Sequence, residues 1–369
     1  MTSPAPGMAP LRVALVVEQL WQQVPGGSGT YIVALARALQ ARADVAVTGI
    51  AARHRRAVPE LGTLLVDHSK LPRRALYGLW NAVGRPRAET LAAAPVDVVH
   101  ATTWAVPGTR RPLVVTVHDL AFMHDPGHFT KRGADYFRRS LVRVHAEAAA
   151  VVVPSEATRI DCLEQGFDQA RLYVVPHGVE VPRIAAADVA TFRERHALIR
   201  PYILWTGTRE PRKNLPRLVE AFRLLRDSGA DVDLVLVGPV GWGDQIAHAP
   251  DGVRVLGRLA EQDLHRAYAG AEVFCFPSLR EGFGLPVLEA MAHGVPVVPS
   301  AGTSTAEIVG GPSAGVLVDP EDPAAIAAGL ASALEHRNVL AAGAARRANR
   351  YSWVRAATDT LEVYRRAAG

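Results

Sequence analysis

The chain has 369 residues, of which 49% are hydrophobic and 21% are charged. This length exceeds that of one compact domain, so we expect two domains that each bury a core of their own. Residues 1–10 lack a cationic start followed by an apolar stretch, and the later apolar runs are too short to span a bilayer. We therefore expect a cytoplasmic protein that is neither exported nor membrane-spanning.

The two cysteines, Cys162 and Cys275, lie in different halves of the chain within apolar patterns. Such cysteines are typical of small core residues in a reducing compartment rather than of a disulfide framework. The motif HDPGH at residues 124–128 has the spacing of metal ligands, but no third and fourth ligands lie nearby in the sequence. The sequence carries no signature of a nucleic-acid-binding motif. We therefore expect neither a bound metal nor a nucleic-acid partner.

Basic residues gather in one segment, although Lys plus Arg number 41 and Asp plus Glu number 36 overall. Residues 53–87, here called the basic segment, carry eight basic side chains and two acidic ones, with aromatic and leucine side chains between them. Three interpretations stay open: a solvated surface, a site for an acidic acceptor, or peripheral contact with anionic lipids at the inner face of the cytoplasmic membrane.

Short β-branched runs alternate with helical patterns along the chain, which predicts parallel βαβ units. In the first half, the expected strands lie at residues 13–17, 45–50, 96–100, 113–118, 151–154 and 172–175. The pattern restarts in the second half, with expected strands at residues 202–207, 232–237, 253–256, 273–276, 295–299 and 315–318.

These patterns predict two doubly wound α/β domains, at residues 1–180 and 195–350, joined by a hinge near residues 178–200. Ligands of such sheets bind at the carboxyl ends of the strands, in loops. A last helix, within residues 351–369, has apolar positions three or four residues apart, so it must pack on another element.

The most informative stretch is FCFPSLREGFGLPVLEAMAHGVPVV, residues 274–298, which reads as strand, glycine loop, helix and strand. Its loop precedes a helix N-terminus, where free amides and the helix dipole attract a phosphate. The carboxylates of Glu281 and Glu289 would repel phosphate but suit hydroxyl groups, with Glu289 facing a ribose and Glu281 a hexose. The alternative is that Glu289 only favours the first helical turn and Glu281 is merely exposed.

A second cluster, WTGTREPRKN at residues 205–214, follows the first strand of the second half and opens a helix. Arg212 and Lys213 can therefore project from a loop and neutralise a pyrophosphate leaving group without a metal ion. Gly207 and Thr208 begin this loop and are expected near the donor. The alternative is a pair of solvated charges, although cations at a helix start oppose the dipole.

Two weaker clusters lie in the first half. The glycines of GGSGTYIVALARAL, among them Gly27, precede an amphipathic helix, and their amides could reach a distal phosphate or the acceptor. His118 and Asp119 end an expected buried strand, where the imidazole could hydrogen-bond sugar hydroxyls and Asp119 could contact the acceptor. A hydrogen-bonded histidine at a strand end is the alternative.

Six motifs together resemble the retaining glycosyltransferases of family 4: EGFGLPVLEAMAHGVPVV, GTREPRKN, GGSGT, VVHATTW, VTVHDL and VVPHGV. The resemblance covers nearly the whole chain and implies the GT-B fold, in which two Rossmann-like domains face each other. Its most specific element is the pair of glutamates eight positions apart around GFGLP. The YSW at residues 351–353 resembles the family's C-terminal segment, which implies that the last helix packs back on the N-terminal domain.

The resemblance also implies roles for single residues. Glu289 binds the ribose of the donor, Glu281 contacts its sugar, Arg212 and Lys213 bind its diphosphate, and His118 is the active-site histidine. Further amides near the phosphates belong to Gly282, Phe283, Gly284 and Leu285, and base recognition falls on backbone groups at residues 255–258, which end at Arg258.

The sequence departs from the family at Thr208, where many members have an arginine. Either Arg209 or Arg212 must then bind the diphosphate, and we favour Arg212 because it adjoins Lys213.

We expect a hexosyltransferase that moves mannose from GDP-mannose to a hydroxyl of a glycan or lipid-linked acceptor, in polysaccharide synthesis, without a metal or other cofactor. Retention of anomeric configuration is implied by the resemblance. No side chain is placed by sequence as a covalent nucleophile, so we prefer a front-face substitution in which the departing phosphate deprotonates the acceptor. The alternatives are a sugar-nucleotide epimerase or glycan phosphorylase of the same fold, or a non-catalytic nucleotide-sugar-binding protein.

Overall fold

The computed structural model describes residues 9–125, 127, 130–241 and 250–369. The chain divides into two compact units. Unit 1 includes the residues up to Gly178 together with Trp353–Gly369, and unit 2 is Val179–Ser352. The last helix therefore belongs to the unit built by the N-terminal half of the chain.

Unit 1 is built on a seven-stranded parallel sheet with the order β3-β2-β1-β4-β5-β6-β7. Strand order reverses between β1 and β4, and such a switch point is where doubly wound sheets bind ligands. The four central strands bury nearly every side chain, as expected of a parallel sheet covered on both faces. The strands are β1 (Leu11–Val16), β2 (Val45–Ala51), β3 (Val66–His68), β4 (Val98–Ala101), β5 (Leu113–Thr116), β6 (Ala150–Val153) and β7 (Leu172–Val174).

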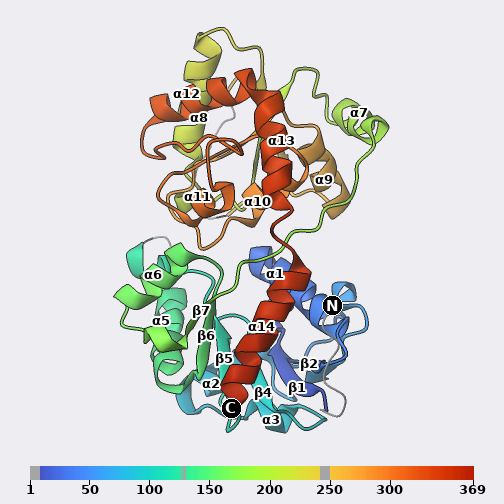
Figure 1. Ribbon diagram of the computed structural model, residues 1–369, viewed down its shortest axis with the longest axis vertical. Helices are drawn as coiled ribbons and strands as arrows, with labels where there is room; N and C mark the ends of the chain where they lie inside the picture. Colours follow the sequence, from blue (N-terminus) through green and yellow to red (C-terminus); the bar gives the residue numbers. More distant parts are fainter. Residues whose placement is uncertain (1–8, 126, 128–129, 242–249) are drawn as a thin grey trace. The chain divides into compact units, whose positions relative to one another are not determined.

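Helices cover this sheet, and α14 (Trp353–Ala368) packs on α1 and on strands β4, β5 and β6 (Figure 1, red). The apolar positions Trp353, Ala357, Leu361 and Tyr364 of α14 are buried, which explains their spacing. The remaining helices are α1 (Gly26–Gln40), α2 (Arg73–Val83), α3 (Ala88–Leu91), α4 (Ala121–His124), α5 (Lys131–Glu147) and α6 (Glu156–Glu164), with short 3-10 turns η1 (Glu18–Trp21), η2 (Pro59–Leu61) and η4 (Gln169–Arg171).

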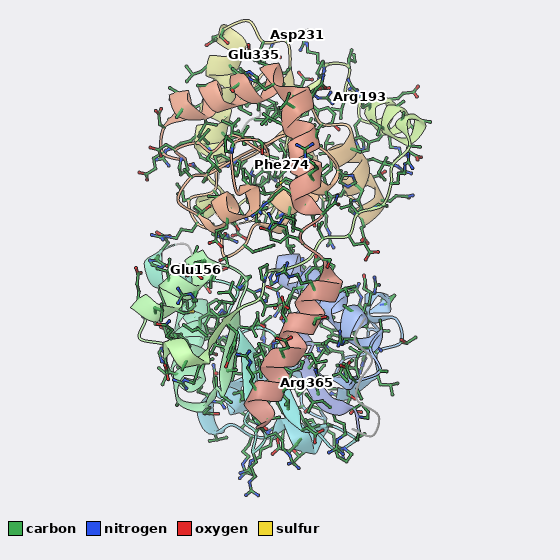
Figure 2. All side chains as sticks on the ribbon, viewed as in Figure 1. Glu156, Arg193, Asp231, Phe274, Glu335 and Arg365 are labelled. Atoms are coloured by element: carbon green, nitrogen blue, oxygen red, sulfur yellow. The ribbon has the colours of Figure 1, made fainter. Side chains whose placement is uncertain are left out.

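Unit 2 contains a five-stranded parallel sheet with the order β10-β9-β8-β11-β12. Phe274 lies inside this unit, whereas Asp231 and Glu335 lie at its surface (Figure 2). The strands are β8 (Tyr202–Thr206), β9 (Asp233–Val237), β10 (Val253–Gly257), β11 (Val273–Phe276) and β12 (Val297–Pro299). The helices are α7 (Ala186–Arg195), η5 (Pro211–Lys213), α8 (Leu215–Asp227), α9 (Glu261–Ala269), α10 (Leu285–Ala292), α11 (Ser304–Val309), α12 (Pro323–Glu335) and α13 (Arg337–Ala348).

One expected strand is absent, and one observed strand was not expected. Residues 315–318 form no strand but only two isolated bridges, from Gly315 to Val297 and from Val318 to Ser300, so the β-branched run pairs at its ends alone. The short strand β3 was missed because its three residues include a polar pair, Asp67 and His68. The segment expected as a hinge, near residues 178–200, begins where unit 1 ends at Gly178 and includes the helix α7.

Candidate active site

The predicted basic and acidic residues of unit 2 meet because their strands are neighbours. Lys213 lies in η5, which follows β8, and Glu281 lies in the loop after β11. Strands β8 and β11 pair in parallel, so their carboxyl ends lie side by side. The sheet thereby joins two motifs that lie far apart in the sequence.

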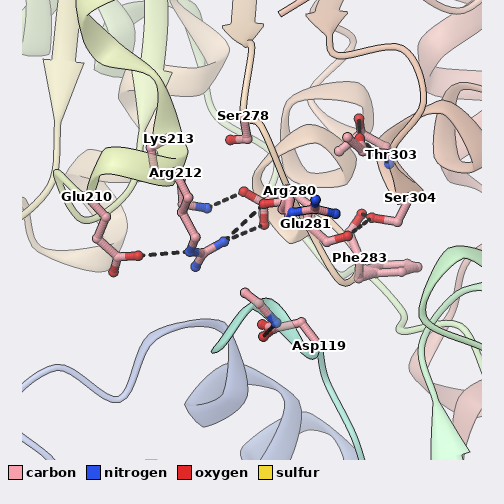
Figure 3. Close-up of polar contacts among 12 residues, drawn as sticks. Asp119, Glu210, Arg212, Lys213, Ser278, Arg280, Glu281, Phe283, Thr303 and Ser304 are labelled. Carbon is pink, nitrogen blue, oxygen red and sulfur yellow. Dashed lines mark hydrogen bonds and ion pairs between the residues drawn. The ribbon is translucent and has the colours of Figure 1, made fainter. Parts of the chain in front are cut away.

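The contact between these motifs is a buried ion-pair cluster (Figure 3). Lys213 Nζ lies 2.5 Å from Glu281 Oε1, and Arg212 Nη1 lies 3.3 Å from Glu281 Oε2. Arg212 also bonds Glu210, with 2.9 Å between Nε and Oε2. We call these four residues the charge cluster. Of the two candidate arginines, Arg212 is the one that contacts Glu281, whereas Arg209 pairs through its backbone with Val240.

Burial and mutual attraction oppose each other within the charge cluster. Burial lowers the pKa of Lys213 and the charge of Arg212 adds to this effect, although Glu281 opposes both. For Glu281, burial favours the neutral acid, but Lys213 and Arg212 outweigh it and hold the pKa below its usual value. Glu281 is therefore ionised at neutral pH, and it already occupies the cations that a diphosphate would need.

The glycine loop of the second motif is held tightly beside this cluster. Gly284 has φ 107° and directly precedes α10, and a Cβ atom there would lie 2.6 Å from the side chain of Thr305. Ser304 donates a hydrogen bond of 2.8 Å to the carbonyl oxygens of Glu281 and Phe283. Gly282, Phe283, Gly284 and Leu285 are all buried. Pro286 lies in the first turn of α10 and Gly294, with φ 72°, follows its last turn, positions that suit proline and glycine at the two ends of a helix.

Glu289 lies on α10 and accepts a hydrogen bond from Tyr268 on α9, with 2.9 Å between Oε2 and the phenol oxygen. Burial raises the pKa of Glu289 to about 7, although the Tyr268 hydrogen bond acts to lower it. No motif pointed to Tyr268, because its position is set by the packing of α9 against α10.

The other residues assigned to donor binding lie along the carboxyl edge of the same sheet. Gly207 directly follows β8 and approaches Gly238 so closely that a Cβ atom on Gly238 would overlap its carbonyl oxygen. Thr208 is partly buried. Arg258 follows the edge strand β10, which β9 separates from β8, and it is exposed.

In unit 1, the ring of His118 is fixed by its surroundings. Its Nε2 donates to the carbonyl of Thr102 at 3.0 Å, and its ring meets Tyr31 edge-on, with 5.0 Å between ring centroids. Burial lowers the pKa of His118, with Asp119 opposing the shift, so the imidazole is neutral at pH 7. Asp119 Oδ1 accepts from the amide of Ala121 at 3.1 Å and thereby supports the start of α4.

His177 also belongs to this group, and reasoning from single residues missed it. It is buried, with its ring 4.6 Å from Tyr31 and 5.8 Å from Trp353, centroid to centroid. Burial lowers its pKa well below the usual value. The only signal for it was its place in the VVPHGV motif.

The glycines of GGSGT were expected to precede a helix, but the structure corrects this. Gly26, Gly27 and Gly29 form the first turns of α1 itself. Gly29 fits against Pro25, since a Cβ atom there would lie 2.5 Å from the proline ring. Gly27 is exposed, and because it has no side chain the backbone amides of the first turn of α1 stay uncovered there.

Within the described residues, no group of three or more His, Cys, Asp or Glu side chains could hold a metal ion. Cys162 and Cys275 are both buried free thiols. None of the helices in the described part of the chain is long and apolar enough to cross a membrane.

Comparison with known proteins identifies the family. Residues 25–183 match the family described as Glycosyltransferase Family 4, and residues 200–336 match Glycosyl transferases group 1. An O-antigen chain mannosyltransferase B of Escherichia coli is 30% identical over 283 residues, which span 73% of this chain and 74% of that protein. The chain belongs to glycosyltransferase family 4.

A further relative and a solved structure of the same fold extend the match. A D-inositol 3-phosphate glycosyltransferase of Salinispora arenicola is 32% identical in an alignment 389 positions long, which covers 92% of this chain and 87% of that protein. The solved structure of HepE from Anabaena, in complex with UDP and glucose, superposes with a TM-score of 0.74 at 18% identity, covering 95% of this chain and 98% of that one. The fold is thus GT-B, with two Rossmann-like parallel-sheet domains, and the protein is a glycosyltransferase rather than one of the alternatives left open by the sequence.

Proposed function

We propose that this glycosyltransferase moves a hexosyl unit from a nucleoside diphosphate sugar to a hydroxyl group of a glycan or lipid-linked acceptor, with retention of configuration. The observation that carries the proposal is the charge cluster beside the N-terminus of α10. Two cations, two carboxylates and the first-turn amides of a helix lie together on the loops that follow β8 and β11. That combination suits a sugar diphosphate, which presents both anionic oxygens and hydroxyl groups.

The proposed roles follow from the charges. Arg212 and Lys213 bind the diphosphate and stabilise the charge that develops on it as it leaves. Their release from Glu281 frees that carboxylate to accept hydrogen bonds from the donor sugar. Amides of Gly282 to Leu285 add to phosphate binding, and His118, whose Nε2 is committed to Thr102, offers Nδ1 to a sugar hydroxyl. The departing phosphate oxygen takes the proton of the acceptor hydroxyl.

We further propose that the donor is GDP-mannose and that no metal ion takes part. The mannosyl assignment is supported by the name of the Escherichia coli relative and by the GTREPRKN loop. The metal-free assignment is supported by the two cations, which together can neutralise a diphosphate. The test also includes uridine nucleotides and their sugars, because the HepE structure holds UDP and glucose.

A thermal-shift panel of nucleoside diphosphates and their sugars, with and without EDTA, tests the donor. A donor at 100 times its dissociation constant stabilises the folded protein by about 2.7 kcal/mol. A selective rise with GDP and GDP-mannose that survives EDTA supports the proposal. A response to uridine compounds alone contradicts the GDP-mannose assignment, and a response abolished by EDTA contradicts the metal-free assignment. NMR of the product's anomeric centre decides whether configuration is retained.

We also propose that the basic segment docks on anionic lipid headgroups. Six of its eight basic side chains are exposed, and none of the eight forms an ion pair among the described residues. Leu79 and Val83 of α2 are 39% and 63% exposed beside them. Unbalanced cations next to exposed apolar side chains complement an anionic bilayer surface.

Vesicle flotation at low salt tests this docking. We expect binding to vesicles that contain phosphatidylglycerol and none to neutral vesicles. Replacing Arg53, Arg55 and Arg56 by alanine should abolish the binding, whereas the control replacement of Arg223, Arg346 and Arg350, exposed on unit 2, should not. Equal binding to anionic and neutral vesicles, or no binding to either, would contradict docking of the basic segment on anionic lipids.

A further inference from the structure

A buried tyrosine of α9 connects Glu289 to the end of strand β8. Tyr268 is fully buried, and its phenol oxygen lies 2.9 Å from Glu289 Oε2 and 2.7 Å from Thr206 Oγ1. Thr206 is itself buried at the last position of β8, directly before Gly207. Three elements that are separate in sequence therefore meet at one phenol group.

The direction of these hydrogen bonds is fixed by chemistry. Burial raises the pKa of Tyr268 well above its usual value, so the phenol keeps its proton at neutral pH. Above the pKa of Glu289, its ionised carboxylate can only accept, so Tyr268 donates its one proton to Glu289 and Thr206 must donate to Tyr268. Oε2 is thereby held in place. No hydrogen bond among the described residues occupies Oε1, which leaves it for a ligand.

A second buried tyrosine in the same unit shows how the hydroxyl of a buried phenol is usually hydrogen-bonded. Tyr202 is equally buried, and its hydroxyl donates to the backbone carbonyl of Ala267 at 2.7 Å. A backbone acceptor gives a buried phenol its hydrogen bond without engaging any group that binds ligand. Tyr268 instead uses the side chain of Glu289, on the helix that follows the glycine loop.

We propose that Tyr268, supported by Thr206, is a positioning residue that orients the Glu289 carboxylate toward the cis-diol of the donor's ribose and so sets selectivity for ribonucleotides. This inference rests on the proposed nucleotide-sugar donor. A carboxylate whose rotation is restrained by one donor keeps its free oxygen aimed at a hydroxyl pair. A nucleotide that lacks one hydroxyl leaves a polar group unpaired, which sites of this kind reject strongly.

The charged and titratable groups around Glu289 leave this assignment intact. The ring of His293 stacks on Tyr268, with 5.8 Å between centroids, and His293 Nε2 lies 2.9 Å from His265 Nδ1. Burial lowers the pKa of both histidines, that of His293 to about 4, so both are neutral near pH 7. Glu261 adds a small upward push on the pKa of Glu289. Glu289 is thus the group in this set that changes charge near neutral pH.

The test compares Tyr268→Phe with the matched control Tyr202→Phe, which also removes a buried phenol oxygen in unit 2. Binding of the preferred nucleoside diphosphate and of its 2′-deoxy and 3′-deoxy forms is measured by calorimetry. We expect Tyr268→Phe to weaken ribonucleotide binding about tenfold while leaving the deoxy forms nearly unchanged, because a charged hydrogen bond is worth roughly this factor. Tyr202→Phe should leave the ribose preference of wild type intact.

A pH profile gives a second readout that a purely structural role would not move. Loss of the phenol donor disfavours the ionised carboxylate, so the acid limb of kcat/KM for the donor should shift to higher pH in Tyr268→Phe. Equal weakening of ribose and deoxyribose ligands, or an unmoved acid limb, would overturn the proposal. If Tyr268→Phe does not fold, Thr206→Val, which removes only the donor to the phenol, is tested in the same way. Wild-type protein that binds no nucleoside diphosphate would instead refute the proposed function.

Discussion

Lys213 Nζ and Glu281 Oε1 lie 2.5 Å apart, on loops that follow two adjacent strands, and their side chains are only 9% and 8% exposed. Two buried charges so close stabilise each other only as a pair, since either one alone would keep the cost of its lost hydration. The pair therefore holds both side chains in place, in an arrangement that the proposed diphosphate donor would use. A diphosphate can take over the cation without leaving it unpaired, while the freed carboxylate turns to hydroxyl groups.

Removing one partner of this pair should abolish activity. We expect Lys213→Ala and Glu281→Ala each to lower kcat/KM by a factor of 100 or more, as loss of a charged group at a developing negative charge does. Breaking a buried pair also costs about 3–5 kcal/mol of folding stability. Initial-rate kinetics with the donor that emerges from the thermal-shift panel provide the measurement.

A double variant separates stability from catalysis. Lys213→Met with Glu281→Met removes both charges, so it should recover most of the stability lost in the single variants while staying inactive. Arg223→Ala, at an exposed position of α8, serves as the control and should keep wild-type rates. If turnover of Lys213→Ala stays within about threefold of wild type, far from the factor expected from such a contact, the proposed role of the charge cluster in diphosphate binding is refuted.

Much of this site could be predicted from sequence because its parts lie in two continuous motifs. A strand, a glycine loop and a helix with Pro286 at its start are written within residues 274–298, and the basic loop is written within residues 205–214. Their neighbourhood follows from the order of a parallel sheet. What the sequence did not contain was the pairing of Lys213 with Glu281, because ion pairs across strands depend on side-chain reach and burial.

Residues that act through packing were beyond the reach of motifs. Tyr268 and Glu289 meet because α9 lies against α10, and neither the length of that contact nor its register appears in a local pattern. Residues 315–318 failed for a related reason: a β-branched run predicts a strand, but whether it pairs along its length is decided by the neighbouring strand β12. The start of α1 was expected after the glycines of GGSGT, about one turn too late, because the permissive backbone of glycine allows either a loop or a helix start.

Glu289 should make stability and activity depend on pH in opposite directions. Its pKa is about 7 in the folded protein against an ordinary value of 4.5, so the folded state is disfavoured as pH rises from 4.5 through 7. Glu289→Gln should therefore gain stability relative to wild type at pH 8, by on the order of 3 kcal/mol, and gain little at pH 4.5. Thermal unfolding of both proteins across this range checks the sign.

Donor use should show the opposite trend, because the ionised carboxylate is the form that accepts from ribose. We expect wild-type kcat/KM to fall below pH 7, and Glu289→Gln to lack this limb at a uniformly lower rate. A variant that is no more stable than wild type at pH 8 would contradict the raised pKa. Unchanged donor binding would contradict the role.

Gly284 should tolerate no side chain. Its φ of 107° strains any L residue, and an added Cβ would lie 2.6 Å from Thr305 Cγ2. Gly284→Ala should cost about 2–4 kcal/mol, from strain and overpacking together, and should impair donor binding because the loop must shift. Gly294→Ala is the matched control, since φ is 72° there and a Cβ would meet nothing within 4 Å. It should cost only about 1 kcal/mol and leave donor binding unchanged. Equal effects of the two substitutions would show that the Thr305 contact is unimportant.

The buried histidine that ties the last helix to unit 1 should make that unit sensitive to acid. His100 is fully buried on β4, with Nδ1 2.7 Å from the hydroxyl of Tyr364 on α14 and Nε2 2.8 Å from Thr116 Oγ1. Burial lowers its pKa to about 3, so the folded protein keeps the ring neutral while the unfolded chain takes up a proton below pH 6.5. This stability is complete above pH 6.5 and falls as the pH is lowered toward 3.

At pH 5 this one group lowers the free energy of unfolding by about 2 kcal/mol, since each pH unit below the unfolded pKa costs about 1.4 kcal/mol. His100→Asn does not titrate, so we expect a variant that is less stable than wild type at pH 7 but loses less stability between pH 7 and pH 5. Urea unfolding at both pH values gives the difference between the two slopes. The buried His118 and His177 stay in both proteins and contribute equally to each slope, so the comparison isolates His100. Equal slopes in the two proteins would mean that His100 already takes up its proton in the folded state.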